Sequence, residues 1–215
     1  MPWAPTSSGS RPDGRLTRLS DTLADLAAAG AVTLREPLDL FAPEGLETPL
    51  PLDHLRLLQR SNGLEGYDGY YRLFGLGRGA GMCMQDWNRP ALWKEAWQGR
   101  ADGYLCFGET GWGDQYAYRA GEPGGEVVRI EAFSMEPEPV AGSFGEFMRG
   151  VFLPCAVKPR DELTVQARAR FGRLPLADHV TFLEPPLAGE LDPARVVRMP
   201  AVAAMRANAA AFAGR

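Results

Sequence analysis

The sequence predicts an α+β protein, in which a twisted antiparallel β-sheet is flanked by helices and followed by a helical C-terminal extension. Three observations predict this class. Two helical patterns come first, three strand-like runs then follow one another without an intervening helix, and a basic, helix-rich tail starts after Pro159. We expect residues 1–15 to be disordered, residues 16–155 to form the α+β domain, and residues 156–215 to form an extension packed on it.

The N-terminal part of the chain is expected to hold two helices. Apolar residues recur at helical spacing over residues 16–27, and Gly30 stands where the residue after a helix C-terminus is commonly glycine. A proline-punctuated loop follows at residues 37–51. The second helix ends before Gly63, and three leucines define its apolar face: Leu52, Leu55 and Leu58.

The sheet is expected to begin with the aromatic and apolar run at residues 70–76. A short helix capped by Asp86 then extends to about Gly99. Ser143 and Glu146 form a capping box that opens a further helix after the sheet. Between these helices the glycine-rich links predict an antiparallel meander of three strands: 104–108, 115–119 and 126–132.

The tail differs from the middle of the chain in charge. Residues 151–215 hold 9 basic and 6 acidic residues, whereas residues 61–150 hold 8 basic and 13 acidic ones. Within the tail we expect a helix near 162–171, an apolar run at 179–183 and an alanine-rich final helix at about 201–212. An acidic middle therefore meets a basic tail.

The composition is that of an ordinary globular chain. Of its 215 residues 45% are apolar and 23% charged, with a formal net charge of −4, so no concentrated basic surface marks a nucleic-acid or membrane binder. The three cysteines lie far apart and support neither a disulfide framework nor a zinc site. No apolar run could span a bilayer, and the first residues lack a hydrophobic signal core. We expect a soluble, cytoplasmic protein without cofactor.

Candidate catalytic residues are few. His54 and His179 have no second histidine at metal-binding spacing, and Cys106 lies in a strand that would bury its thiol. Glu109 and Asp114 border one turn and could form an acid/base pair, although Asp114 bonding to backbone N–H groups is the stronger alternative. Because no nucleophile, base and metal come together, we expect no enzyme and no catalytic or metal-binding residue.

The strands also carry many aromatic and acidic side chains. If one face of the sheet is covered, about half of the aromatic side chains point inward. Glutamates recur along residues 122–138 with few cations nearby. Two interpretations stay open: an ordinary solvated face, or an acidic patch that binds a basic protein.

The order of these motifs resembles the SUKH superfamily over roughly residues 50–153. The matching segments are the helix ending in "SNG" at 61–63, the tryptophans Trp87 and Trp97, the hairpin "CFGETGWGDQYAYR", the strand "VVRI" and the helix "SFGEFM". The superfamily groups a fungal regulator of cell-wall synthesis with bacterial immunity proteins of polymorphic toxin systems. Residues 171–199 are also similar to the closing segment of an immunity domain found beside type VI secretion effectors.

The resemblance implies a non-enzymatic protein that binds a cognate bacterial toxin, such as a nuclease, and occludes it. The alternative is an intracellular scaffold or regulatory module whose partner is not a toxin, as the fungal relative implies. In such interfaces aromatic anchors supply affinity and charge complementarity supplies speed. The expected partner-binding residues are Glu109, Trp112, Asp114, Tyr118, Glu122, Glu126, Glu131, Glu136 and Glu138.

Overall fold

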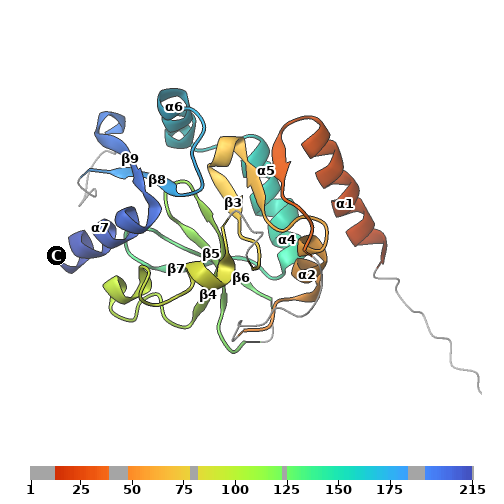
Figure 1. Ribbon diagram of the computed structural model, residues 1–215, viewed down its shortest axis with the longest axis horizontal. Helices are drawn as coiled ribbons and strands as arrows, with labels where there is room; N and C mark the ends of the chain where they lie inside the picture. Colours follow the sequence, from red (N-terminus) through yellow and green to blue (C-terminus); the bar gives the residue numbers. More distant parts are fainter. Residues whose placement is uncertain (1–12, 39–47, 78–81, 123–124, 184–191, 215) are drawn as a thin grey trace, which may run out of the picture.

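The computed structural model describes residues 13–38, 48–77, 82–122, 125–183 and 192–214. Within this part of the chain, seven antiparallel strands form one sheet in the order β1 to β7, and a separate two-stranded ribbon, β8–β9, lies beside it (Figure 1). The strands are β1 Val32–Leu34, β2 Leu64–Gly66, β3 Tyr71–Leu73, β4 Tyr104–Thr110, β5 Gln115–Arg119, β6 Val127–Ile130, β7 Pro137–Ala141, β8 Asp178–Phe182 and β9 Val196–Pro200. The α+β class predicted from the sequence is confirmed.

The helices surround this sheet, with α1 at the right of Figure 1 and α7 at the left. The first helix begins at Asp13, three residues earlier than expected, and residues 1–12, for which we expect disorder, lie outside the described residues. The helical elements are α1 Asp13–Ala28, α2 Leu52–Leu58, η1 Tyr67–Gly69, α3 Met84–Trp87, η2 Lys94–Trp97, α4 Phe144–Phe147, the π-helical turn η3 Met148–Phe152, α5 Leu153–Val157, α6 Glu162–Phe171, η4 Pro193–Arg195 and α7 Ala201–Ala213.

One face of the sheet packs against the helical segment α4–η3–α5. The predicted capping box opens this segment, because the Ser143 hydroxyl accepts a hydrogen bond from the backbone N–H of Glu146. The Phe147 ring then lies 5.6 Å from Phe107 of β4 and 4.8 Å from Tyr116 of β5. Burial of these rings is the main force that holds the helices on the sheet.

The opposite face is covered as well, by the C-terminal segment and by α3. Arg72, Glu109 and Gln115 stand opposite one another in the registers of β3, β4 and β5 and therefore share this face, yet each is 4% exposed or less. The condition considered in the sequence analysis, a sheet with one covered face, is therefore not met at these strands. The tail shields the second face from water, so both sets of alternating side chains in β4 are buried.

The sheet is larger than the sequence predicts. The expected first strand, residues 70–76, contributes only β3, which is preceded by β1 and β2. Those two strands have three residues each, too few to show a two-residue period. The edge strand β7 was also not predicted, because it contains Pro137 and Pro139, and proline is confined to edge strands and bulges.

Two predicted helix details are wrong. Leu58 is buried as predicted, but Leu52 is 61% exposed, and the buried face of α2 carries His54, Leu57 and Leu58. These positions are spaced i, i+3 and i+4, the stripe that a helix presents to a core, whereas the three predicted leucines advance by three residues and drift around it. Asp86 lies inside α3 and does not cap it.

No helix in the described part of the chain is long and apolar enough to cross a membrane.

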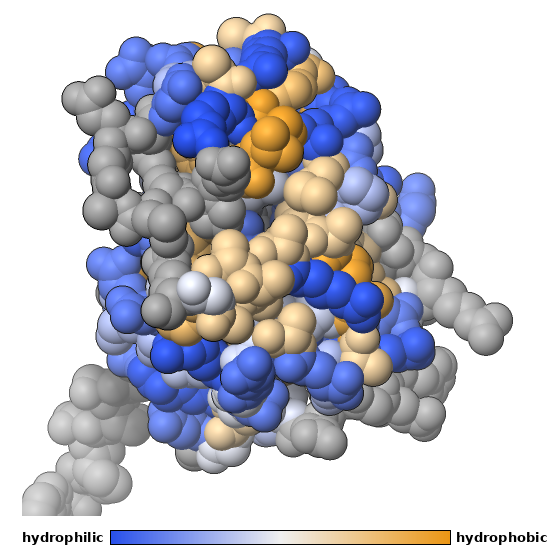
Figure 2. Space-filling model, turned by 90° about the vertical axis from the view of Figure 1, so that its left-hand side faces the viewer, coloured by the Kyte–Doolittle hydropathy of each residue, from blue (hydrophilic) through white to orange (hydrophobic). Residues whose placement is uncertain are grey.

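The final helix is rich in alanine, and Figure 2 shows an apolar band between hydrophilic surfaces on the side of the molecule where α7 lies. Exposed alanines of α7, such as Ala207 and Ala210, belong to this side.

Candidate functional site

The covered second face holds a buried polar network, which consists of Arg72, Glu109, Gln115, His179 and Trp87. Arg72 Nη1 lies 3.0 Å from Glu109 Oε1, and His179 Nε2 lies 3.0 Å from Glu109 Oε2. Gln115 donates to Glu109 Oε2 at 3.2 Å and accepts a hydrogen bond from Trp87 Nε1 at 2.7 Å. These are the residue types of a catalytic centre, so their accessibility decides what they can do.

Neighbouring groups favour the ionised form of Glu109 although it is out of water. Burial raises the pKa of Glu109, but the nearby His179 and Arg72 and the hydrogen bond from Gln115 outweigh burial, so the pKa lies below its usual value. Burial lowers the pKa of Arg72, and Glu109 opposes that shift. The side chains of Arg72, Glu109 and His179 are 0% exposed. A substrate therefore has no access to them, and their chemistry is structural.

Arg72 joins the sheet to the C-terminal segment. Its Nη1 donates to the carbonyl oxygen of Leu176, and its Nη2 donates to those of Pro175 and Asp178, each at 2.9 Å. Its Nε donates to the carbonyl of Gly69 at 2.6 Å. A guanidinium has five N–H donors in a rigid fork, and this one uses them on the sheet and the tail together.

Further ion pairs join the acidic middle of the chain to its basic tail. Glu65 pairs with Arg173 at 3.0 Å, and Asp68 pairs with Arg168 at 2.6 Å. Part of the opposite charge seen in the sequence is thus satisfied within the molecule and is not offered to a partner.

Two predicted partner-binding residues, Glu109 and Tyr118, lie in the interior and cannot touch a partner, so this part of the prediction is corrected. Glu109 belongs to the buried polar network. Tyr118 is 3% exposed, its ring stacks on Phe107 at 4.4 Å, and its hydroxyl lies 3.0 Å from His54 Nδ1. Both positions are buried because helices cover one face of the sheet and the tail covers the other.

Trp112 and Asp114, in the turn between β4 and β5, mainly make internal contacts. The ring of Trp112 stacks on Phe182 of β8 at 5.5 Å, and its Nε1 donates to Thr164 of α6 at 2.8 Å, so the expected exposed anchor is half-buried under the tail. Asp114 Oδ1 accepts a hydrogen bond from the backbone N–H of Ala132, and burial raises its pKa. Asp114 thus bonds a backbone N–H group, but one outside the turn, whereas the N–H groups of Trp112 and Asp114 within the turn donate to the Thr110 hydroxyl.

The remaining predicted residues are all exposed and form what we call the glutamate surface: Glu122, Glu126, Glu131, Glu136 and Glu138. Two of the five have cation partners: Arg119 lies 3.9 Å from Glu126, and Arg129 lies 2.8 Å from Glu138. Among the described residues no cation lies within 4.0 Å of Glu122, Glu131 or Glu136. The surface follows both ends of β6 and the edge strand β7.

Sequence analysis missed the pairing of Arg72, Gln115 and His179 with Glu109. The available signal was the charge contrast between the middle of the chain and its tail. It indicated that these two segments attract each other, but it did not identify the residues that pair with Glu109. Across the residues that the structure describes, no group of three or more His, Cys, Asp or Glu side chains could hold a metal ion. Burial raises the pKa of the Cys106 thiol to about 11, which disfavours the reactive thiolate.

The fold and surface together define an α+β protein in which internal charges are paired and exposed glutamates gather at one edge of the sheet. The model of the SMI1 / KNR4 family (SUKH-1) matches residues 42–150, which is half of the chain, and the chain belongs to this family. The SUKH membership inferred from the motifs is confirmed.

A crystal structure of Atu4351 from Agrobacterium tumefaciens has a similar fold. The TM-score is 0.53 at 13% sequence identity, and the similarity covers 85% of this chain and 86% of that one. At this identity the likeness concerns the fold alone. No curated protein sequence matches the chain.

Proposed function

We propose that this protein is a cytoplasmic immunity protein, which binds a bacterial toxin with a basic surface and occludes it. Membership of the SMI1 / KNR4 family, which includes immunity proteins as well as the fungal regulator, supports this proposal. The observation that carries it is the glutamate surface, whose five exposed carboxylates follow both ends of β6 and the edge strand β7, and three of which have no cation partner among the described residues.

Exposed, unpaired carboxylates favour a basic partner for two reasons. They raise the rate of encounter with a cationic protein by long-range attraction, and they impose a cost on acidic proteins at the same surface. Nucleases carry basic surfaces because their substrate is a polyanion. A nuclease-type effector of a polymorphic or type VI secretion system is therefore the partner that this surface fits best.

The first test is co-expression with the product of the neighbouring gene. We expect the protein to restore growth of cells that express the toxin and to co-purify with it. If the two proteins bind but the neighbour is not toxic, the regulatory or scaffold role is favoured instead. If the neighbour is toxic and is neither bound nor neutralised, the proposal is wrong.

Charge reversal tests the surface itself. The variant carries Glu122→Lys, Glu131→Lys and Glu136→Lys. We expect its association rate constant with the toxin at low salt to fall by about tenfold or more, since steering changes such rates by roughly 10 to 10³. An unchanged rate would mean that these glutamates are only solvated surface.

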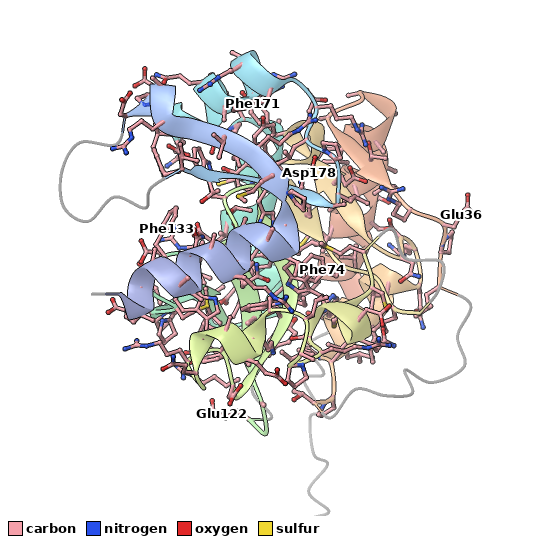
Figure 3. All side chains as sticks on the ribbon, turned by 60° about the vertical axis from the view of Figure 1, so that its left-hand side comes forward. Glu36, Phe74, Glu122, Phe133, Phe171 and Asp178 are labelled. Atoms are coloured by element: carbon pink, nitrogen blue, oxygen red, sulfur yellow. The ribbon has the colours of Figure 1, made fainter. Side chains whose placement is uncertain are left out.

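A matched control keeps the same change in net charge but places it elsewhere. Asp21, Asp25 and Glu36 are exposed, and the two aspartates lie on α1, which packs against β1 at the opposite edge of the sheet from β7. Figure 3 shows Glu36 and Glu122 on different sides of the molecule. Replacing these three residues by lysine should lower the rate much less than the reversal on the glutamate surface.

A further inference from the structure

A groove of about 700 Å³ opens where β4 begins and β5 ends. Its described walls come from the segment that contains α3 and η2 on one side, and from Tyr104, Leu105 and Ala120 on the other. The hydrogen bond from the N–H of Ala120 to the carbonyl of Gly103 joins the two strand ends at 2.7 Å. We call this the η2 groove.

The cations of the η2 groove are already engaged. Arg89 pairs with Asp86 at 2.7 Å. Lys94 is 5% exposed, and its ammonium donates to the backbone carbonyl of Tyr104 at 2.7 Å. Both positive charges are therefore bonded to the groove's own wall or to the adjoining helix.

Two carboxylates of the groove, unlike its cations, have no partner of opposite charge among the described residues. Glu95 and Asp102 line it and are exposed, and neither has a cation within 4.0 Å in the described part of the chain. Pro90 and Leu105 add apolar wall between the polar groups. A groove of this kind fits a side chain that is long, apolar along its stem and positively charged at its tip.

Tyr104 gives the groove an aromatic wall, and its ring already contacts one guanidinium of this chain. Within this chain, the guanidinium of Arg119 lies over its ring at 5.6 Å from the centroid and donates to its hydroxyl at 3.1 Å. Arginine stacks on aromatic rings and bonds carboxylates through a planar fork, whereas lysine offers a point charge.

The η2 groove adjoins one end of the glutamate surface, where Glu122 and Glu126 lie. Ala120 in its wall is two residues from Glu122, and Arg119 beside Tyr104 lies 3.9 Å from Glu126. Figure 3 shows Glu122 at the lower end of the molecule, close to the yellow-green turns that include η2. A partner that covers these glutamates therefore reaches the mouth of the groove.

We infer that the η2 groove receives an arginine side chain of the protein partner, with its guanidinium between Glu95 and Asp102 and its stem along Pro90 and Leu105. The inference rests on the proposed function and adds to it the kind of side chain by which the partner would bind this groove. Arginine is among the residues that most often dominate the energy of protein interfaces, especially when it enters a pocket.

The probe for this site is N-acetyl-L-arginine amide, titrated into the full chain and followed by amide NMR shifts at low salt. We expect saturable shifts confined to residues 88–105 and 119–122, with a dissociation constant on the order of millimolar. N-acetyl-L-citrulline amide has nearly the same shape without the charge, and it should cause no saturable shift. Equal shifts with both probes, or shifts located elsewhere, would overturn the inference.

Paired variants identify the carboxylates. Glu95→Gln with Asp102→Asn should weaken binding of the arginine probe by more than about tenfold, since each of the two lost charge-assisted contacts is worth roughly tenfold. Asp21→Asn with Asp25→Asn makes the same change of charge on α1 and should leave binding unchanged. If both variants bind equally, Glu95 and Asp102 do not hold the guanidinium and the inference fails.

The two proposals can fail separately. If the protein neutralises its toxin but the η2 groove does not bind the arginine probe, the groove inference is wrong and the immunity function stands. If the groove binds arginine and no toxin is neutralised, the immunity function is wrong and the chemistry of the groove stands.

Discussion

His54 makes the stability of this protein depend on pH in a way that one substitution can isolate. The side chain lies on α2 and is 0% exposed. Its ring stacks on Phe144 at 4.2 Å, Nδ1 lies 3.0 Å from the Tyr118 hydroxyl, and Nε2 has no protein partner. Burial lowers the pKa of His54 from 6.5 to about 3, so the folded protein keeps this imidazole neutral.

The direction of the change in stability follows from the number of protons that the folded and the unfolded states bind. Below pH 6.5 the unfolded chain binds a proton at His54, whereas the folded chain does not until about pH 3. Stability therefore falls as the pH drops through this window, by roughly 1.4 kcal/mol for each unit. At pH 4.5 the loss from this one group amounts to about 3 kcal/mol, a large part of the free energy of unfolding of a typical domain.

The variant is His54→Phe combined with Tyr118→Phe, which keeps the aromatic stack and leaves no buried hydroxyl without a partner. We expect it to lose about 3 kcal/mol less than the wild type between pH 7 and pH 4.5. Urea unfolding followed by tryptophan fluorescence at both pH values measures the two losses.

Tyr118→Phe alone is the control, because it keeps His54 and should retain the full acid-induced loss. Carboxylates with lowered pKa values, such as Glu109, contribute equally to all three proteins and cancel in the comparison. If the double variant loses as much stability as the wild type, His54 is not the group that titrates, and the reasoning from its burial is refuted.

Four single substitutions, two of which are also combined, test the internal contacts. Glu109→Gln leaves the charge of Arg72 buried without its carboxylate and should lower the free energy of unfolding by about 3–5 kcal/mol, measured in urea. The double variant with Arg72→Met should lose less free energy of unfolding than the sum of the losses of the two single variants. Gly66→Ala places a Cβ atom 2.3 Å from that of Ala156 and should destabilise by about 1–3 kcal/mol in the same assay. Ser143→Ala removes the cap of α4 and should cost about 1 kcal/mol in thermal unfolding.

Each of these outcomes has a counterpart that would contradict it. Strictly additive losses for Glu109 and Arg72 would mean that the two charges do not interact. A fully stable Gly66→Ala protein would mean that α5 does not approach β2 as closely as the structure shows. An unchanged melting temperature for Ser143→Ala would mean that its hydroxyl adds nothing to the helix start.

Local signals predicted the elements that depend on local chemistry. The capping box at Ser143, the helix over residues 162–171 and the strands on either side of the turn at Gly113 are set by residues close in sequence. The short strands β1 and β2 were not predicted, because they exist through pairing with one another and with β3, and three residues carry no visible period.

The candidate site was predictable only in part, for a reason that Glu109 illustrates. A polar side chain alternating with apolar ones in a strand normally faces water. Here Arg72 and His179, from elements distant in the sequence, meet Glu109 inside the protein. Burial of this kind depends on tertiary contacts, which the pattern of a single strand does not show. The prediction that the five glutamates are exposed was therefore correct, whereas the prediction that Glu109 and Tyr118 are exposed was wrong.

The position of the partners of Arg72 has a consequence for synthesis of the protein. Chains fold from the N-terminus while they emerge from the ribosome, but this arginine is made about a hundred residues before the carbonyls at 175–178 that it bonds. Until those residues emerge, Arg72 can bond only Gly69, Glu109 and water, so the second face of the sheet is completed late in synthesis. We expect a chain that ends before residue 175 to have a lower free energy of unfolding than the full chain, because its Arg72 lacks these three carbonyl partners.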